Sequence, residues 1–180
     1  MSMAALQPAC DPVAYVVMGV SGCGKSSVGK AIADRFGLEF VEGDALHPEA
    51  NIAKMSQGIA LTDEDRFPWL DRIGRAVAAS LAAGQGLVIS CSALKKVYRD
   101  RLRALADGRL IFVYLSGAKG VLAARMAART GHFMPPSLLE SQLSTLEIPT
   151  EEEGVLTVDI SGSQAEVIEL ALEGLGYIPR

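Results

Sequence analysis

The sequence predicts an α/β fold, a three-layer α/β/α sandwich in which a five-stranded parallel sheet is covered by helices on both faces. Short apolar runs alternate with amphipathic helical patterns along the whole chain, and this order favours a parallel sheet. The 180 residues are 49% hydrophobic and 21% charged, which is typical of a compact soluble protein. We therefore expect a single domain over residues 1–180.

Each strand is predicted from a short apolar run, and each helix from apolar residues at helical spacing. The candidate strands are Ala14–Met18, Leu38–Val41, Leu87–Ile89, Leu110–Leu115 and Leu156–Ile160. A helix follows the first strand and is expected to stop at Gly37. Four more helical stripes are Phe67, Leu70, Ile73, Val77 and Leu81; Leu94, Val97, Leu102 and Leu105; Val121, Leu122 and Met126; and Leu138, Leu139 and Leu143.

The last helix is expected to open with a capping box, Ser163 to Glu166. Two inter-strand stretches, 42–85 and 116–154, are too long for simple crossovers. Insertions at the strand ends of such folds usually hold a second substrate and a mobile lid. We expect a substrate-binding insertion at about 45–84 and a lid at about 125–150.

The sequence G-x-x-x-x-G-K-S lies between the first strand and the first helix, the context of a phosphate-binding loop. Glycines let backbone N–H groups converge on phosphate oxygens, and the helix N-terminus adds its positive dipole. Lys25 is predicted to bridge the terminal phosphates of ATP, and the Ser26 hydroxyl to bind Mg²⁺. The expected nucleotide-binding residues are Gly19, Val20, Ser21, Gly22, Cys23, Gly24, Lys25, Ser26 and Ser27.

Two carboxylates, Glu42 and Asp44, end the second strand beside this loop. An acceptor hydroxyl needs a carboxylate that orients it and takes its proton, and Mg²⁺ needs oxygen ligands around its water shell. We assign Asp44 to the hydroxyl and Glu42 to the metal. The alternative is that both are solvated loop charges.

Composition excludes several partners. The formal charge of −4 argues against nucleic acid or an anionic membrane, and no apolar run approaches the length of a membrane span. The N-terminus lacks the features of a secretory signal, and the three cysteines are widely spaced. We expect reduced thiols in a cytoplasmic protein, with Cys23 sensitive to alkylation because it lies at a helix N-terminus.

Longer runs resemble the gluconokinase family, which is related to the shikimate and nucleoside monophosphate kinases. The resemblance as a whole covers nearly all of residues 14–178. These runs are 43–48, 51–55, 58, 61–70, 90–95, 98–99, 131–135, 138–143 and 146–149. The resemblance implies a P-loop kinase that phosphorylates D-gluconate at its 6-hydroxyl with ATP and Mg²⁺, often as a homodimer. Glu42 and Ala60 depart from the residues that many relatives carry there, aspartate and proline.

Gluconate is a polyol with a carboxylate, so its pocket needs a cation at one end. Lys95 and Arg99 are four residues apart on one predicted helix face and could meet an anion together. Arg66 is a second candidate, while His47 and Trp69 could supply a donor and an apolar wall. Each residue also has an alternative role that involves no substrate. Lys95 could be solvated at a helix start, His47 could cap a turn, and Trp69 could belong to the core.

Arg125 and Arg129 are four residues apart after the fourth strand. In related small kinases such a segment closes over ATP, so we expect both guanidinium groups to stabilise the transferring phosphoryl group. The following loop contains His132, a further candidate substrate contact. A surface helix with solvated arginines is the alternative.

Two other functions stay open at this point. One is a kinase of the same fold with a different acceptor, such as shikimate. The other is a phosphate-loop switch that hydrolyses nucleotide to regulate a partner. The run from His47 to Trp69 argues against shikimate or a nucleotide as the acceptor.

Overall fold

The computed structural model describes residues 11–129 and 135–176. Its centre is a sheet of five parallel strands in the order β2-β3-β1-β4-β5. Both central pairings use β1, which is why this strand is wholly buried. The strands are β1 (Ala14–Met18), β2 (Glu39–Glu42), β3 (Leu87–Ser90), β4 (Leu110–Ser116) and β5 (Val155–Asp159).

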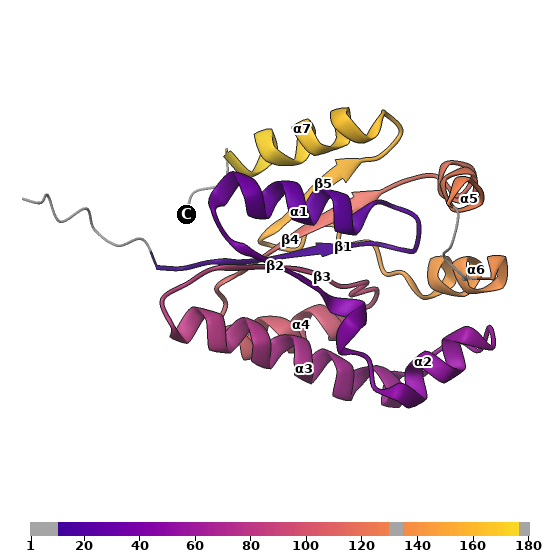
Figure 1. The fold of residues 1–180 in the computed structure, drawn as a ribbon, viewed down its shortest axis with the longest axis horizontal. Coiled ribbons are helices and arrows are strands. Elements are labelled where there is room, and N and C mark those ends of the chain that lie inside the picture. Colours follow the sequence, from indigo (N-terminus) through magenta and orange to yellow (C-terminus); the bar gives the residue numbers. More distant parts are fainter. Residues whose placement is uncertain (1–10, 130–134, 177–180) are drawn as a thin grey trace, which may run out of the picture.

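Helices cover both faces of this sheet (Figure 1). Helices α1 (Lys25–Phe36) and α7 (Gln164–Gly176) pack together on one face, and α3 (Asp63–Ala82) packs with α4 (Lys96–Leu105) on the other. The expected three-layer sandwich is confirmed. Burial of β1, β3 and almost all of β4 between these layers explains their continuous apolar character.

The insertions gather beyond one edge of the sheet, where the chain leaves β1 (Figure 1). They comprise a 3₁₀ turn (Gly43–Leu46) and helices α2 (Glu49–Ser56), α5 (Lys119–Ala128) and α6 (Pro136–Thr145). Ligands of parallel sheets bind at the carboxyl edge of the strands. The chain thus places these insertions at the edge of the sheet where a substrate would bind.

The five strands lie within about one residue of their predicted ranges, and the Ser163–Glu166 capping box is present. Helix α2 was not predicted, because its eight residues carry too short a periodic pattern. The α4 stripe was partly wrong: Val97 is 50% and Leu105 37% exposed. The side chains that α4 buries are Tyr98, Arg99 and Leu102.

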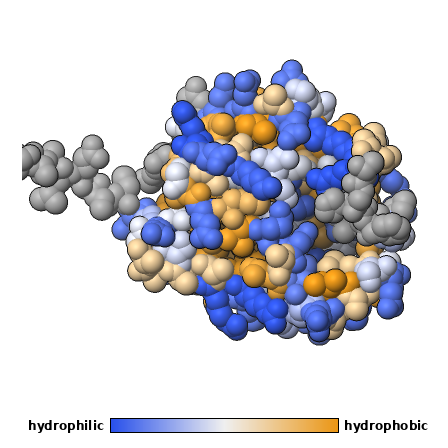
Figure 2. All heavy atoms as spheres, in the orientation of Figure 1, coloured by the Kyte–Doolittle hydropathy of each residue, from blue (hydrophilic) through white to orange (hydrophobic). Residues whose placement is uncertain are grey.

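Hydrophilic residues dominate the surface in Figure 2, with smaller apolar areas between them. Among residues 11–129 and 135–176, no helix is both long enough and apolar enough to span a membrane.

Candidate active site

The phosphate loop connects β1 to α1, as predicted. Gly22 has a φ of 82°, and a Cβ there would lie 2.7 Å from Met126 Cγ, so only glycine fits the turn. The Lys25 ammonium lies over the loop and donates to the carbonyl oxygens of Gly19 and Val20, both at 3.1 Å. A short reorientation would bring this charge to a phosphate in the loop.

Two adjoining cavities meet at this loop. The first, the nucleotide cleft, is lined by Gly22, Gly24 and Ser26 and extends to Arg129, which directly follows α5. The second, the acceptor pocket, lies between the loop, the segment 55–61 and α6. Ser21, Lys25 and Asp44 line both cavities. The place where they meet is therefore where a donor phosphate and an acceptor hydroxyl can come together.

Glu42 connects the loop to the neighbouring strands. Its carboxylate accepts hydrogen bonds from the hydroxyls of Ser26, at 2.6 Å, and Ser90. The Ser90 hydroxyl also accepts from the Gly43 N–H at 3.1 Å. A Cβ on Gly43 would lie 1.8 Å from the Ser90 carbonyl oxygen, so glycine is required for this close approach.

The Ser26 hydroxyl and the Glu42 carboxylate are hard oxygen donors beside the phosphate loop, a donor set that fits Mg²⁺. In the described part of the chain, no cluster of three or more histidine, cysteine or acidic side chains could hold a metal alone. The usual Mg²⁺ site of phosphoryl-transfer enzymes takes most of its ligands from phosphate and water. When bound, the ion neutralises phosphate charge.

Asp44 is the exposed carboxylate of the site, with 70% of its side chain accessible. It lies 3.9 Å from His47 Nε2. The His47 ring stacks on Trp69 at a centroid distance of 4.0 Å, and its Nδ1 lies 3.2 Å from Asn51 Nδ2. Trp69 donates to the Gly43 carbonyl oxygen at 2.8 Å and is 1% exposed.

Because it is buried, Trp69 is a core residue and not an apolar wall that contacts the substrate. Its ring packs against the His47 ring. His47 itself lines the acceptor pocket. Desolvation by burial lowers the pKa of His47 from 6.5 to about 4, against the opposing charge of Asp44. The imidazole is therefore neutral at pH 7 and serves as a hydrogen-bonding group.

The lowered pKa of His47 predicts acid sensitivity of the fold. The unfolded chain takes up this proton near pH 6.5 and the folded chain only near pH 4. The contribution of His47 to stability is therefore complete above pH 6.5 and is lost as the pH falls toward 4. Urea denaturation at pH 7, 6 and 5 should show a shallower pH dependence for His47→Gln than for the unmodified protein. Equal slopes would contradict the assignment.

Arg66 is the buried cation of the acceptor pocket. It is 8% exposed, it lines the pocket, and its guanidinium carbon lies 5.7 Å from the centre of the Tyr98 ring. Within the described residues, Arg66 Nε is the sole buried side-chain nitrogen or oxygen without a hydrogen-bond partner. Leaving such a donor unsatisfied is costly. An anionic ligand in the pocket would satisfy it.

Lys95 and Arg99 do not lie together at a place where both could bind one anion. This corrects the prediction that the two residues form the cation site of the acceptor pocket. Lys95 precedes α4 and pairs with Asp63 at 2.9 Å, and neither lines the acceptor pocket. Asp63 also accepts from the Tyr98 hydroxyl. Hydrogen bonds from Tyr98 and Lys95 lower the pKa of Asp63, which keeps it charged.

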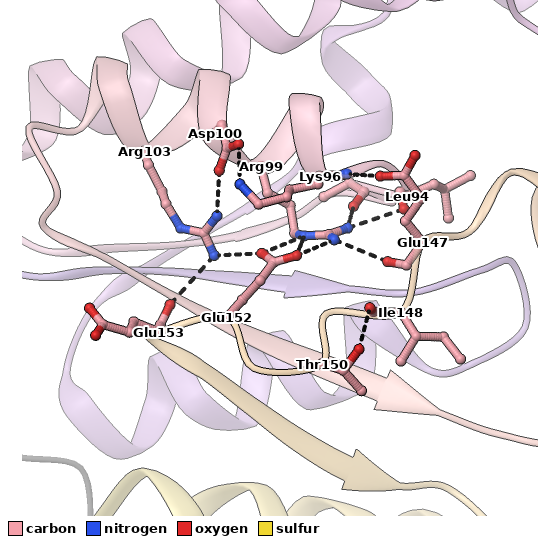
Figure 3. A network of polar contacts seen from close by, with 11 residues as sticks. Leu94, Lys96, Arg99, Asp100, Arg103, Glu147, Ile148, Thr150, Glu152 and Glu153 are labelled. Carbon is pink, nitrogen blue, oxygen red and sulfur yellow. Dashed lines mark hydrogen bonds and ion pairs between the residues drawn. The ribbon is translucent and has the colours of Figure 1, made fainter.

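Arg99 is 0% exposed and its donors are engaged (Figure 3). It pairs with Glu152 at 2.5 Å and donates to the carbonyl oxygens of Ala93, Leu94 and Glu147. Arg99 thereby fastens the segment after α6 to the start of α4. Its role is structural, and i,i+4 spacing alone could not distinguish an inward-facing arginine from a pocket residue.

Arg99→Met should therefore destabilise the fold. It leaves Glu152, whose side chain is 10% exposed, without its main partner, and breaking such a buried pair costs about 3–5 kcal/mol. Arg101→Met is the matched control, because the Arg101–Asp71 pair is more exposed and should contribute about 1 kcal/mol or less. Chemical denaturation of both variants measures the difference. Equal losses would contradict the structural role of Arg99.

The structure places Arg125 and Arg129 in different surroundings. Arg129 lines the nucleotide cleft. Arg125 donates to the carbonyl oxygens of Ile160 and Gly162, at 2.6 and 3.0 Å, and lies beside Gly24. This corrects their expected action as a pair on the transferring group, because Arg125 faces the loop after β5. His132 lies outside the described residues.

Cys23 and Ser27 belong to the loop and the first turn of α1. The Cys23 side chain is 0% exposed, with its sulfur beneath Gly19. This burial contradicts the expected alkylation sensitivity. Cys91 is equally inaccessible, and burial raises its pKa to about 12.

Sequence reasoning missed three polar residues of the site: Ser90, Asn51 and Gln142. Ser90 orders Glu42, and Asn51 contacts His47. Gln142 accepts a hydrogen bond from the Ser21 N–H at 2.7 Å across 121 positions of sequence. No local sequence pattern predicts contacts between residues so far apart in the chain. A polar residue at the end of a buried strand, as at Ser90, was the one usable signal.

Comparisons with known proteins find relatives among the kinases. A family model described as Shikimate kinase matches residues 21–159. The gluconokinase of Gluconobacter oxydans (strain 621H) is 50% identical over 152 residues, covering 84% of this chain and 85% of the relative. The thermosensitive gluconokinase of Escherichia coli (strain K12) is 44% identical over 156 residues, covering 86% and 83%.

Solved structures give the same result. A gluconokinase from Sinorhizobium meliloti 1021 superimposes with a TM-score of 0.85 at 56% identity, covering 92% of this chain and 93% of that one. The APS kinase CysC of Mycobacterium tuberculosis has a TM-score of 0.62 at 19% identity, which bears on the fold alone. On these grounds the chain belongs to the shikimate kinase family, among the gluconokinases.

Proposed function

We propose that this protein transfers the terminal phosphoryl group of ATP to the 6-hydroxyl of D-gluconate, giving 6-phospho-D-gluconate and ADP. The observation that carries the proposal is the buried Arg66, which lines the same pocket as Asp44 and whose Nε has no hydrogen-bond partner among the described residues. The acceptor must bring an anion to the guanidinium and a hydroxyl to the carboxylate. Gluconate has both groups at opposite ends of a short polyol.

The nucleotide cleft binds the phosphate donor, and the acceptor pocket binds the sugar acid. Loop amides and Lys25 hold the triphosphate, and Arg129 adds positive charge at the rim of the nucleotide cleft. Asp44 orients the acceptor hydroxyl and takes its proton as the new P–O bond forms. His47 stays neutral and offers a hydrogen bond to the polyol. Arg66 holds the carboxylate. Arg125 lies beside Gly24 of the phosphate loop and donates to the carbonyl oxygens of Ile160 and Gly162.

Three finer assignments belong to the same proposal. Ser26 and Glu42 hold Mg²⁺ with the phosphates, supported by their adjacent oxygens. A cytoplasmic location and a homodimer follow from the family resemblance, and sedimentation analysis would test the second. A small-molecule acceptor, rather than nucleic acid or a membrane, agrees with the net charge of −4.

One assay separates the candidate functions: ADP release with gluconate, shikimate, AMP or water as the sole acceptor. The proposal predicts rapid release with gluconate and slow release with each of the others. Preference for shikimate would indicate another acceptor on the same fold. Equal release with and without any acceptor would indicate a nucleotide-hydrolysing switch, and either result would overturn the proposal.

Arg66→Met should raise the KM for gluconate about 10- to 100-fold, the loss expected for hydrogen bonds between charged groups. Discrimination against glucitol, which replaces the carboxylate by an alcohol, should fall by the same factor. Steady-state kinetics with both acceptors measure the effect. Arg72→Met is the control on the same helix, because Arg72 contacts only the Leu46 carbonyl oxygen among the hydrogen bonds of the described residues. An unchanged KM in Arg66→Met would exclude the carboxylate contact.

A further inference from the structure

Gln142 joins the wall of the acceptor pocket to the phosphate loop. Its carboxamide oxygen accepts from the Ser21 N–H at 2.7 Å, and the residue also lines the acceptor pocket with Leu138 and Ser141. Ser21 lines both cavities. The contact therefore lies at the place where donor phosphate and acceptor hydroxyl meet.

The two ends of α6 are held by other parts of the chain. Beyond its C-terminal end, Glu147 donates its N–H to the Leu94 carbonyl oxygen at 2.8 Å and accepts from the buried Arg99 at 3.0 Å (Figure 3). This end of α6 is thus fixed to the rim of the sheet. At its other end, a Cβ on Gly58 would lie 3.4 Å from Pro135, so α6 begins against the substrate-binding insertion. The Gln142–Ser21 bond connects the middle of α6 to the catalytic loop.

We propose that Gln142 is a positioning residue that directs the phosphoryl group to the sugar acid rather than to water, an inference that rests on the proposed function. Through Ser21, docking of α6 completes the wall around Asp44 and excludes solvent from the point of transfer. A substrate in the acceptor pocket packs against the same helix. Acceptor binding and the geometry of the phosphate loop are coupled through this hydrogen bond.

Without the bond, α6 is held to the loop less firmly and water reaches the terminal phosphate. Water then forms the new P–O bond, the bond to the bridging oxygen of ADP breaks, and Asp44 takes the proton that a sugar hydroxyl would have given. The products are ADP and inorganic phosphate. The expected signature is therefore lost coupling between ADP release and phosphorylation of gluconate.

The test compares Gln142→Leu and Gln142→Asn with the unmodified protein. Leucine removes the acceptor oxygen, and asparagine retracts it by one methylene. Both variants should raise the ratio of inorganic phosphate to 6-phosphogluconate formed by about fivefold, the factor for one neutral hydrogen bond. The KM for ATP should change less than the ratio. Ser144→Ala is the control on α6, since its exposed hydroxyl contacts only the Glu140 carbonyl oxygen among the hydrogen bonds of the described residues.

Ratios that stay at the unmodified value in both variants would overturn the inference, whether or not kcat falls. If Gln142→Leu does not fold, the conservative Gln142→Asn decides. The coupling of the unmodified protein tests the proposed function separately. Absence of gluconate phosphorylation there would overturn that function, whereas efficient coupling in every variant would overturn only the role of Gln142.

Discussion

Replacing Lys25 by methionine should lower kcat by about 100- to 1,000-fold, the range for removing one preorganised group that stabilises transition-state charge. Lys25 lines both cavities and is held at the loop by two carbonyl oxygens at 3.1 Å. Affinity for ADP should fall less than kcat, because the lost charge acts mainly on the transferred group. Steady-state kinetics and ADP titration together measure the contrast.

Arg35→Met is the matched control, because this exposed cation lies at the far end of the same helix. It should turn over at the rate of the unmodified protein. A Lys25→Met protein that retains more than about a tenth of its kcat would contradict the transfer site described above.

Asp44→Asn should reduce kcat by about 100- to 10,000-fold, the range for loss of a general base. The KM for gluconate should change little, because the amide still accepts a hydrogen bond from the hydroxyl and Arg66 still holds the carboxylate. Measuring kcat and KM with saturating ATP separates the two effects.

Glu49→Gln makes the same chemical change on an exposed part of the neighbouring helix α2 and should have no effect. Normal kcat in Asp44→Asn would remove Asp44 from the role of base. A large rise in KM with normal kcat would make it a binding residue only.

The sequence predicted best what local pattern encodes. Buried parallel strands read as apolar runs, and the phosphate loop needs glycines at fixed spacing whatever lies around it. For this reason β1, the loop and the start of α1 lie where they were predicted. Asp44 follows from the same logic, since the carboxyl ends of parallel strands share one edge.

Sequence spacing could not show which of three candidate cations lies in the acceptor pocket. Arg66, Lys95 and Arg99 all lie on or beside predicted helices, and only packing separates them. Arg99 is satisfied by four protein groups and Lys95 by Asp63, whereas Arg66 keeps a buried donor unpaired. Such differences arise from contacts between residues that are about 30 to 50 positions apart. Helical periodicity carries no information about them.

Gln142 and Trp69 show that the type of a side chain does not predict whether it lies at the site. Trp69 was a candidate for the apolar wall of the substrate pocket, with a core position as the alternative, and its buried ring stacks on His47. Gln142 has an ordinary side chain on a short helix, yet it reaches the catalytic loop. Side-chain type predicts what a residue can do, and tertiary packing decides where it does so.

The central claim is that the acceptor hydroxyl meets the terminal phosphate between Asp44 and Lys25, with the acceptor's carboxylate on Arg66. A crystal structure with gluconate and a non-hydrolysable ATP analogue tests it most directly. We predict the Asp44 carboxylate within about 3 Å of the 6-hydroxyl oxygen and the Arg66 guanidinium on the sugar-acid carboxylate. Gluconate bound in the reverse direction, or outside the pocket that Asp44 and Arg66 share, would contradict the account.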